Sequence, residues 1–372
     1  MTAKLRRTEK GYTLMELLIA MGLGLVVVGA AVQLFSRSME GTFLVAQRAE
    51  MQQDVRAAEN MLVKDIGLAG AGLPPGGVAL ATGGAKKPIY GCDQAKCYVG
   101  GSPPAGISFP GGSSPYLYWL TPGFQLGPVV FSGQPATDII TVAQGDTAFP
   151  WANYQMSMNS SATTGTVNLV TSAPINATSL PLPDVCNAKT PCKLSDPAYG
   201  LKTGDLVLVS GKSGANTISA VGEVSANVTG TATPYTVSFS ATDALGFNQS
   251  GATSNSLAQM KSLTGLSITR LFLITYYIST ANGTPTLMRQ VNGQTPAPVA
   301  ENIINLQFQY DTYDDTGTRS YSSSPTSLNQ IRKIELLHMT ARSEMRGAKG
   351  YQTMDIQTSV SARNMSFKNR YQ

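Results

Sequence analysis

The sequence has little of what most catalytic sites are built from. Its 372 residues include a single histidine, His338, and that residue lies within residues 331–340, a run that predicts a β-strand. A catalytic histidine needs a nucleophile and an orienting acid, and the sequence offers no local signature of either. No GxSxG, HExxH or Walker pattern occurs. These absences predict a protein that is not an enzyme, binds no cofactor and is not itself a nucleotide-driven motor.

Cysteine is also scarce. The four cysteines fall in two close pairs, Cys92 with Cys97 and Cys186 with Cys192. Four cysteines allow three pairings, but such spacing favours small loop-closing disulfides formed in an oxidising compartment. A zinc site with four cysteine ligands is the competing interpretation, although neither pair has the CxxC spacing typical of zinc knuckles. We therefore expect local disulfides and no metal.

Charged residues make up only 13% of the chain, and the net charge is +5. The first ten residues contribute +3 of this, because Lys4, Arg6, Arg7 and Lys10 outnumber Glu9. The densest basic segment elsewhere holds Arg342, Arg346 and Lys349, offset by Glu344. It has no interleaved aromatic residues on which bases would stack. The composition therefore argues against nucleic acid as a partner.

A long hydrophobic run follows the basic start. Residues 17–35 are 19 residues without a formal charge, and at about 1.5 Å per residue they nearly match a hydrocarbon core of roughly 30 Å. We expect this segment to span a membrane, and the preceding positive residues favour the cytoplasmic side, which leaves the rest of the chain outside. A secretory signal peptide has its small-residue cleavage site after the apolar run, whereas Gly11 stands before it.

The residues from Lys10 to Leu17, Lys-Gly-Tyr-Thr-Leu-Met-Glu-Leu, resemble the class III leader of type IV prepilins and pseudopilins. The resemblance implies that a prepilin peptidase removes residues 1–11 by cleaving between Gly11 and Tyr12. The same enzyme would then methylate the new α-amine of Tyr12, a position where the family more often has phenylalanine. Glu16 takes the position of the family's characteristic glutamate.

Glu16 is also distinctive on physical grounds. A carboxylate at the edge of an apolar helix is costly to desolvate unless a cation meets it. The α-amine created at Tyr12, in the same subunit or a neighbouring one, is such a cation at the same depth. We therefore expect Glu16 to pair with an N-terminus during assembly; the alternative is a side chain that extends to the membrane interface.

A helical pattern continues beyond the apolar run. Apolar residues recur mostly at three- and four-residue steps among polar ones, at Leu44, Met51, Val55, Ala58, Leu62 and Ile66. One helix is predicted from about Tyr12 to Ile66, with a membrane-spanning part over residues 12–35 and an amphipathic region over residues 36–72. Gly22, Gly24, Gly29 and Gly41 weaken it locally. They suit either bending and partial melting during assembly or close helix packing in the membrane.

Residues 73–372 are predicted to form a β-rich domain outside the cytoplasm. Alternating or β-branched runs predict strands at residues 138–142, 166–170, 205–209, 217–224, 235–239, 268–278, 286–291, 303–310, 331–340 and 353–362. The expected fold class is therefore α+β, with a long helix followed by a pilin-like sheet. About 300 residues exceed a typical domain of roughly 100 to 150 residues, so we expect an inserted β lobe within about residues 145–265.

An acidic cluster follows the predicted strand at residues 303–310. Asp311, Asp314 and Asp315 precede Gly317, and oxygen-rich clusters of this kind suit calcium. Tyr313, however, stands where a calcium loop would place an oxygen ligand, and Gly317 falls one position late. A solvated acidic turn is the favoured interpretation, with calcium as the alternative.

The order of the C-terminal motifs resembles that of PilW-type minor pilins. The similarity involves residues 205–210, 276–278, 287–289, 301–310, 331–335 and 360–364. It implies a subunit stored in the inner membrane with its domain in the periplasm, which joins other minor and major pilins through an inner-membrane assembly platform. Its place would be the priming or tip complex of a type IV pilus on the cell surface. A minor pseudopilin of type II secretion and a membrane-anchored adhesin are the alternatives.

Overall fold

The structure is a computed structural model that describes residues 11–74, 76–84, 89–90, 98–99, 116–159, 164–169, 193–230, 234–240, 245–249, 251–314, 316–325, 327–343, 350–362 and 364–365. Its contacts divide the chain into two compact units, residues 1–52 with 343–352 and residues 53–342 with 353–372. The predicted disulfide residues Cys92, Cys97, Cys186 and Cys192 lie outside the described residues.

Helix α1 (Leu14–Gly67) is continuous over 54 residues. The predicted helix is confirmed, with its start two residues later and its end one residue later than expected. Gly22 to Gly41 do not interrupt it. Beyond its C-terminal end, Gly70 takes a left-handed backbone conformation with φ of 75°. A Cβ atom on Gly70 would lie 2.8 Å from the Trp119 ring, so both the backbone and the packing require glycine there.

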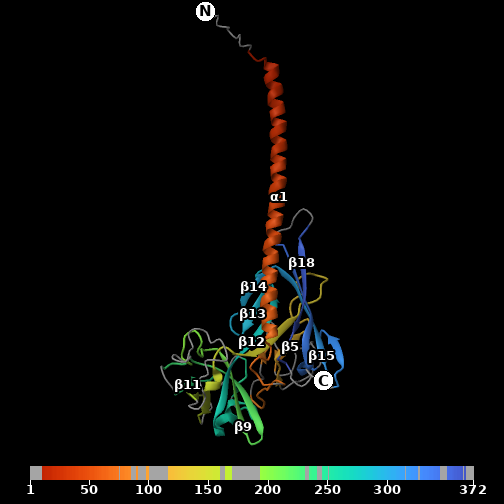
Figure 1. Ribbon diagram of the computed structural model, residues 1–372. Coiled ribbons are helices and arrows are strands. Elements are labelled where there is room, and N and C mark those ends of the chain that lie inside the picture. Colours follow the sequence, from red (N-terminus) through yellow and green to blue (C-terminus); the bar gives the residue numbers. More distant parts are fainter. Residues whose placement is uncertain are drawn as a thin grey trace, which may run out of the picture. The chain divides into compact units, whose positions relative to one another are not determined.

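The last turns of α1 belong to the β-rich unit and bury one face. Val55, Ala58, Leu62 and Ile66 are all fully buried, which confirms this part of the predicted apolar stripe. In the view of Figure 1, strands β13 (Thr286–Val291) and β14 (Ala297–Glu301) lie to one side of these turns and β15 (Ile303–Tyr313) to the other. Packing of this stripe, rather than helix propensity, therefore fixes the C-terminal half of the helix.

The larger sheet is antiparallel, has ten strands and is organised around β12 (Leu266–Ser279). The first half of β12 pairs with β9 and β7, and its second half pairs with β6 and β13. Strands β10, β8, β11, β5 and β14 extend these neighbours outward. The remaining strands are β5 (Leu120–Gly123), β6 (Ile139–Gly145), β7 (Tyr154–Met158), β8 (Thr164–Leu169), β9 (Leu206–Ser213), β10 (Asn216–Glu223) and β11 (Tyr235–Ser238).

A second, four-stranded antiparallel sheet has the order β16-β15-β17-β18. It consists of β15 with β16 (Arg319–Ser322), β17 (Ile331–Arg342) and β18 (Thr353–Ser361). Two small sheets pair β1 (Val78–Ala79) with β4 (Tyr116–Leu117) and β2 (Ile89–Tyr90) with β3 (Tyr98–Val99). Short 3-10 helices are η1 (Trp151–Asn153), η2 (Leu257–Ser262) and η3 (Leu328–Gln330).

A separate hydrophobic cluster is formed by buried residues between positions 149 and 268. It includes Phe149, Trp151, Val209, Val237 and Leu257, all of them buried. The strands around this cluster continue into the ten-stranded sheet through β12. The boundaries of the inserted lobe, about residues 145–265, stay a prediction.

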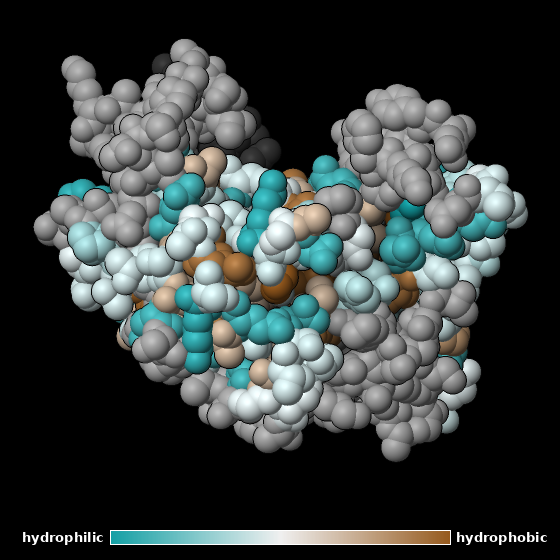
Figure 2. Space-filling view, turned by 90° about the horizontal axis from the view of Figure 1, so that it is seen from below, coloured by the Kyte–Doolittle hydropathy of each residue, from teal (hydrophilic) through white to brown (hydrophobic). Residues whose placement is uncertain are grey.

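The α+β class is confirmed, since a long apolar helix precedes a β-rich domain. Each of the ten predicted strand regions coincides with a strand. The short strands β1 to β4 and the strands β5, β7, β14 and β16 were not predicted. Figure 2 shows hydrophilic and near-neutral residues over most of the coloured face, with hydrophobic residues gathered in a central band.

Candidate functional site

The peptide bond predicted to be cleaved lies just before α1. Gly11, Tyr12 and Thr13 precede the helix without regular secondary structure, and the Tyr12 side chain is 88% exposed. Among the described residues other than Gly11 and its chain neighbours, no heavy atom lies within 4 Å of the position that a Cβ would occupy on Gly11. The Gly11–Tyr12 bond is therefore accessible to a peptidase in this conformation.

Thr13 and Glu16 form a reciprocal cap at the start of α1. The Thr13 hydroxyl accepts a hydrogen bond from the Glu16 backbone N–H at 3.3 Å. In return, Oε2 of Glu16 accepts hydrogen bonds from the backbone N–H and the hydroxyl of Thr13, both at 3.0 Å. This is the capping box that Ser or Thr followed three residues later by Glu encodes. The spacing is visible in the sequence, although the role of Thr13 was not predicted from it.

The cap holds the Glu16 carboxylate against Thr13, which would be the second residue of the cleaved chain. Because Oε2 already contacts the Thr13 backbone, the α-amine of a mature Tyr12 would be the adjacent cation in the chain. The Glu16 side chain is exposed rather than buried against its own helix. The pairing of Glu16 with an N-terminus remains a prediction.

The side chains that follow Glu16 form an apolar surface. Leu17, Leu25, Val28 and Phe35 are each more than half exposed, and the other large apolar residues between them are exposed as well. Within the part of the chain that the structure describes, α1 is the helix long and apolar enough to cross a membrane. An exposed apolar helix of this length is stable in lipid or against other helices, but not in water.

A polar cluster fastens the other end of α1 inside the β-rich unit. Asp65 is buried, and its Oδ2 accepts hydrogen bonds from the Tyr276 hydroxyl on β12 at 2.6 Å and from Arg289 Nε on β13 at 2.8 Å. Burial and the neighbouring Asp65 carboxylate raise the pKa of Tyr276, so its hydroxyl remains a donor. The signal for Asp65 in the sequence is a charged residue inside the apolar stripe, and its role was not predicted.

His338 lies on β17, where the sequence predicted it. Its Nε2 atom is 3.5 Å from Oδ1 of Asp355 and 3.4 Å from the Thr340 hydroxyl. Both contacts involve the same ring nitrogen, and the Thr340 hydroxyl itself donates to Asp355 at 2.6 Å. A catalytic triad needs the nucleophile and the acid on opposite nitrogens of the imidazole, so these three residues do not have that arrangement.

The structure corrects the prediction of a solvated acidic turn at Asp311. Strand β15 continues to Tyr313, and Asp311 is buried with its carboxylate bound by Arg319, whose Nε lies 2.8 Å from Oδ2. Asp314 does lie in a turn, where bonds from the Thr316 hydroxyl and the Thr318 N–H lower the pKa of its carboxyl. Asp315 is outside the described residues. Among described side chains, no group of three or more acidic, histidine or cysteine residues is placed to hold a metal.

The predicted basic segment is described only in part. Arg342 ends β17, and its guanidinium lies 5.1 Å from the centre of the Phe131 ring. Glu344, Arg346 and Lys349 lie outside the described residues.

Comparison with known proteins bears on the N-terminus. Residues 6–32 match the family model of the prokaryotic N-terminal methylation motif. A search of curated proteins and a search of solved structures found no match. The matched residues include Gly11, Tyr12 and Glu16 and extend into the exposed apolar part of α1. The motif implies processing by a prepilin peptidase, membrane anchoring and assembly with other pilins. The chain therefore carries a prepilin-like leader of the kind found in type IV pilin-type and pseudopilin-type proteins.

Proposed function

We propose that this protein is a minor pilin of a type IV pilus, which acts in the initiation of assembly or in the tip complex. The observation that carries the proposal is the combination of a methylation motif, an exposed apolar helix and a large β-rich unit on one chain. The helix stores the subunit in the inner membrane. Transfer into a helical filament then buries the same apolar surface against other helices, so the subunit's role is mechanical rather than chemical.

Size supports a low-copy position over the repeating one. Removal of the first 11 of 372 residues leaves a mature chain of 361 residues, which is bulky for a subunit that must repeat along a thin filament. A tip position has no neighbour on one side and accommodates the ten-stranded sheet with its additional hydrophobic cluster. The neutral polar composition, with 13% charged residues, suits contact with other tip proteins or with an external surface.

Mass spectrometry of the mature N-terminus tests the route into the filament. Cells with and without the prepilin peptidase should differ: the chain begins at N-methylated Tyr12 only when the peptidase is present. A Gly11→Val variant, with a branched side chain before the scissile bond, should remain uncleaved. An intact Met1 in both strains would exclude both filament functions and leave a membrane-anchored β domain.

A second measurement separates a pilus from type II secretion, which uses pseudopilins with the same leader. Deletion of the gene should abolish or reduce surface pili and twitching while enzyme export continues. Sheared filaments should contain the protein at a small fraction of the major subunit. Loss of export with normal pili would assign the protein to type II secretion instead.

A further inference from the structure

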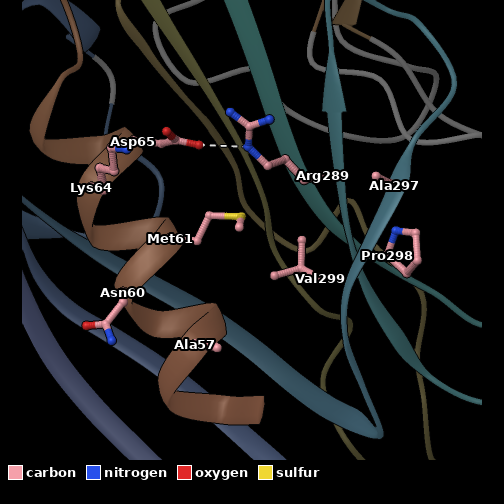
Figure 3. A pocket seen from close by; sticks show the side chains of 9 residues that line it. All are labelled: Ala57, Asn60, Met61, Lys64, Asp65, Arg289, Ala297, Pro298 and Val299. Carbon is pink, nitrogen blue, oxygen red and sulfur yellow. Dashed lines mark hydrogen bonds and ion pairs between the residues drawn. The ribbon is translucent and has the colours of Figure 1, made fainter. Parts of the chain in front are cut away.

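A groove of about 500 Å³ runs within the β-rich unit between the last turns of α1 and strand β14. Figure 3 shows α1 as one wall and the β14 strand as the other. Ala57, Met61 and Lys64 line the helical wall, Pro298 and Val299 line the strand wall, and Arg289 lies at one end. The groove is separate from the leader and the membrane-spanning part of the helix.

The middle of the groove is apolar and open to solvent. Met61 is 41% exposed, and Figure 3 shows its side chain and that of Val299 on facing walls. Ala57, one helical turn before Met61, is small and exposed, which leaves room beside it. A flexible, polarizable methionine lies opposite a branched aliphatic residue on this surface. Covering both with an apolar partner removes them from water and therefore stabilises the complex.

The charged end of the groove carries one positive charge in excess. Arg289 is neutralised by Asp65, 2.8 Å away. Lys64 is exposed and forms no ion pair with the residues that the structure describes. A partner that fills the apolar middle and presents a carboxylate at this end would match both features.

The strand wall is unsuited to strand addition. In the described sheet, β14 pairs with β13 alone and is an edge. Its sequence, however, is Ala-Pro-Val-Ala-Glu, with a further proline just before it at Pro296. Proline lacks the N–H that an incoming strand would need, and prolines on an edge protect it from such pairing. With strand pairing disfavoured, a helix that inserts side chains spaced one turn apart is the better match to the groove.

We propose that this groove binds an α-helix of a neighbouring pilin-type subunit, which places apolar side chains between Met61 and Val299 and a carboxylate beside Lys64. The chain's own α1 shows that such a helix has suitable chemistry, because exposed Glu40 lies beside the exposed apolar residues Met39 and Phe43. This inference rests on the proposed function, since it requires a second filament subunit. It adds a lateral contact that the apolar N-terminal part of the helix does not provide.

Site-specific photocrosslinking of the full-length protein in cells tests the groove. The photoreactive amino acid p-benzoylphenylalanine replaces Met61 in one strain and Lys212, an exposed residue of β9, in the control strain. The expected product at position 61 joins this protein to a chain that begins with an N-methylated residue. The crosslinked peptide should lie in the N-terminal helix of that chain. Position 212 should not give this product.

Substitutions in the position-61 background test the charge and the space. Lys64→Gln should lower the crosslink yield several-fold, Lys64→Arg should restore it, and Lys212→Gln should leave it unchanged. Ala57→Trp should also lower the yield, because the indole occupies the groove. The melting temperature of each variant identifies any loss of yield that comes from misfolding. If Ala57→Trp does not fold, the comparison of Lys64→Gln with Lys64→Arg decides the test.

Three results would overturn the inference. The first is a crosslink at position 61 that maps to strands or loops of the partner. The second is a yield at position 61 no higher than at position 212. The third is a helix crosslink that Lys64→Gln leaves unchanged. The N-terminus of the probe-bearing protein is measured in the same samples. If it is N-methylated Tyr12 and the crosslinks fail, only the groove assignment fails; if it is still Met1, the proposed function fails as well.

Discussion

Asp65 and Arg289 are 224 residues apart in the chain, yet the Arg289 Nε atom lies 2.8 Å from Oδ2 of Asp65. The Tyr276 hydroxyl shares the same oxygen at 2.6 Å and is 3.1 Å from Arg289 Nε. Helix α1 is thereby tied to two neighbouring strands, β12 and β13, of the β-rich unit. This cluster holds one wall of the proposed groove in place.

Loss of the Asp65 carboxylate should destabilise the β-rich unit. Asp65→Ala leaves Arg289 and Tyr276 without their shared acceptor, and we expect a loss of about 2 to 4 kcal/mol in the free energy of unfolding. The lower part of that range allows for the 28% exposure of the Arg289 side chain. Tyr276→Phe should cost only about 1 kcal/mol, because Asp65 then keeps Arg289.

Urea unfolding of the full-length protein in detergent measures these losses. Trp119 and Trp151 are the two tryptophans of the chain and both are buried in this unit, so their fluorescence reports its unfolding. Lys212→Ala serves as the surface control. Equal stability of Asp65→Ala and the control would show that the cluster contributes nothing to the anchoring of the helix.

Asp138 should make the folded state less stable as the pH rises, which is opposite to the usual effect of a carboxylate in a folded protein. Its buried carboxylate accepts hydrogen bonds from the backbone N–H groups of Gln125 and Phe308, both at 2.8 Å. Burial nevertheless raises the pKa of Asp138 to about 6. The folded state therefore holds a proton that the unfolded state releases between about pH 4 and pH 6, so this residue's contribution to stability falls as the pH rises through that window.

The comparison of wild type with Asp138→Asn isolates this effect. The stability of wild type relative to the variant should fall by about 2 to 3 kcal/mol from pH 4 to pH 7. Asp314→Asn is the control of opposite sign, because the lowered pKa of Asp314 gives stability that is lost as the pH falls. A difference between wild type and Asp138→Asn that is constant with pH would refute the raised pKa.

Arg270 on β12 should stabilise the folded state through ion pairs and a hydrogen bond beside the hydrophobic cluster formed by residues between 149 and 268. Its Nε donates to Asp146 at 3.0 Å, its Nη1 donates to the carbonyl of Gly200 at 2.9 Å, and Asp205 is 3.5 Å from Nη1. Arg270→Met retains much of the side-chain volume but removes the cation that contacts the buried Asp146 and the partly buried Asp205. We expect a loss of about 3 to 5 kcal/mol at pH 7.

The pH dependence of this loss distinguishes charge from packing. Burial already raises the pKa of Asp205 in the presence of Arg270. In Arg270→Met the Asp205 carboxylate should bind a proton more readily, so the penalty should shrink as the pH falls toward 4. The same penalty at both pH values would assign the loss to packing alone.

The sequence predicted the long helix and ten strands because their apolar periodicity is local. Strand β5 was missed since it contains Pro122 and Gly123, which normally indicate a turn, and its pairing with β6 overrides that preference. Strand β7 alternates buried and exposed residues, so its signal was present but short. Asp65 itself stands out in the sequence as a charge in the apolar stripe, but its partners Tyr276 and Arg289 could not be predicted because they lie more than 200 residues away. The burial of Asp311 likewise depends on Arg319 from the next strand.

The capping box at the start of α1 allows the two roles of Glu16 to be separated. Thr13→Val keeps the shape of the side chain but removes the hydroxyl that accepts from Glu16 N–H and donates to its carboxylate. It should weaken the first turn by about 1 kcal/mol and leave filament entry nearly unchanged. Glu16→Gln keeps an oxygen that accepts from the Thr13 N–H but removes the charge, so a protonated α-amine at Tyr12 loses its partner.

We expect both variants to be processed by the peptidase, and only Glu16→Gln to remain in the membrane. The ratio of the protein in sheared filaments to that in membranes measures this, with Glu59→Gln on the same helix as the charge-matched control. Filament entry by Glu16→Gln at the wild-type level would mean that the carboxylate acts through the cap and not through its charge.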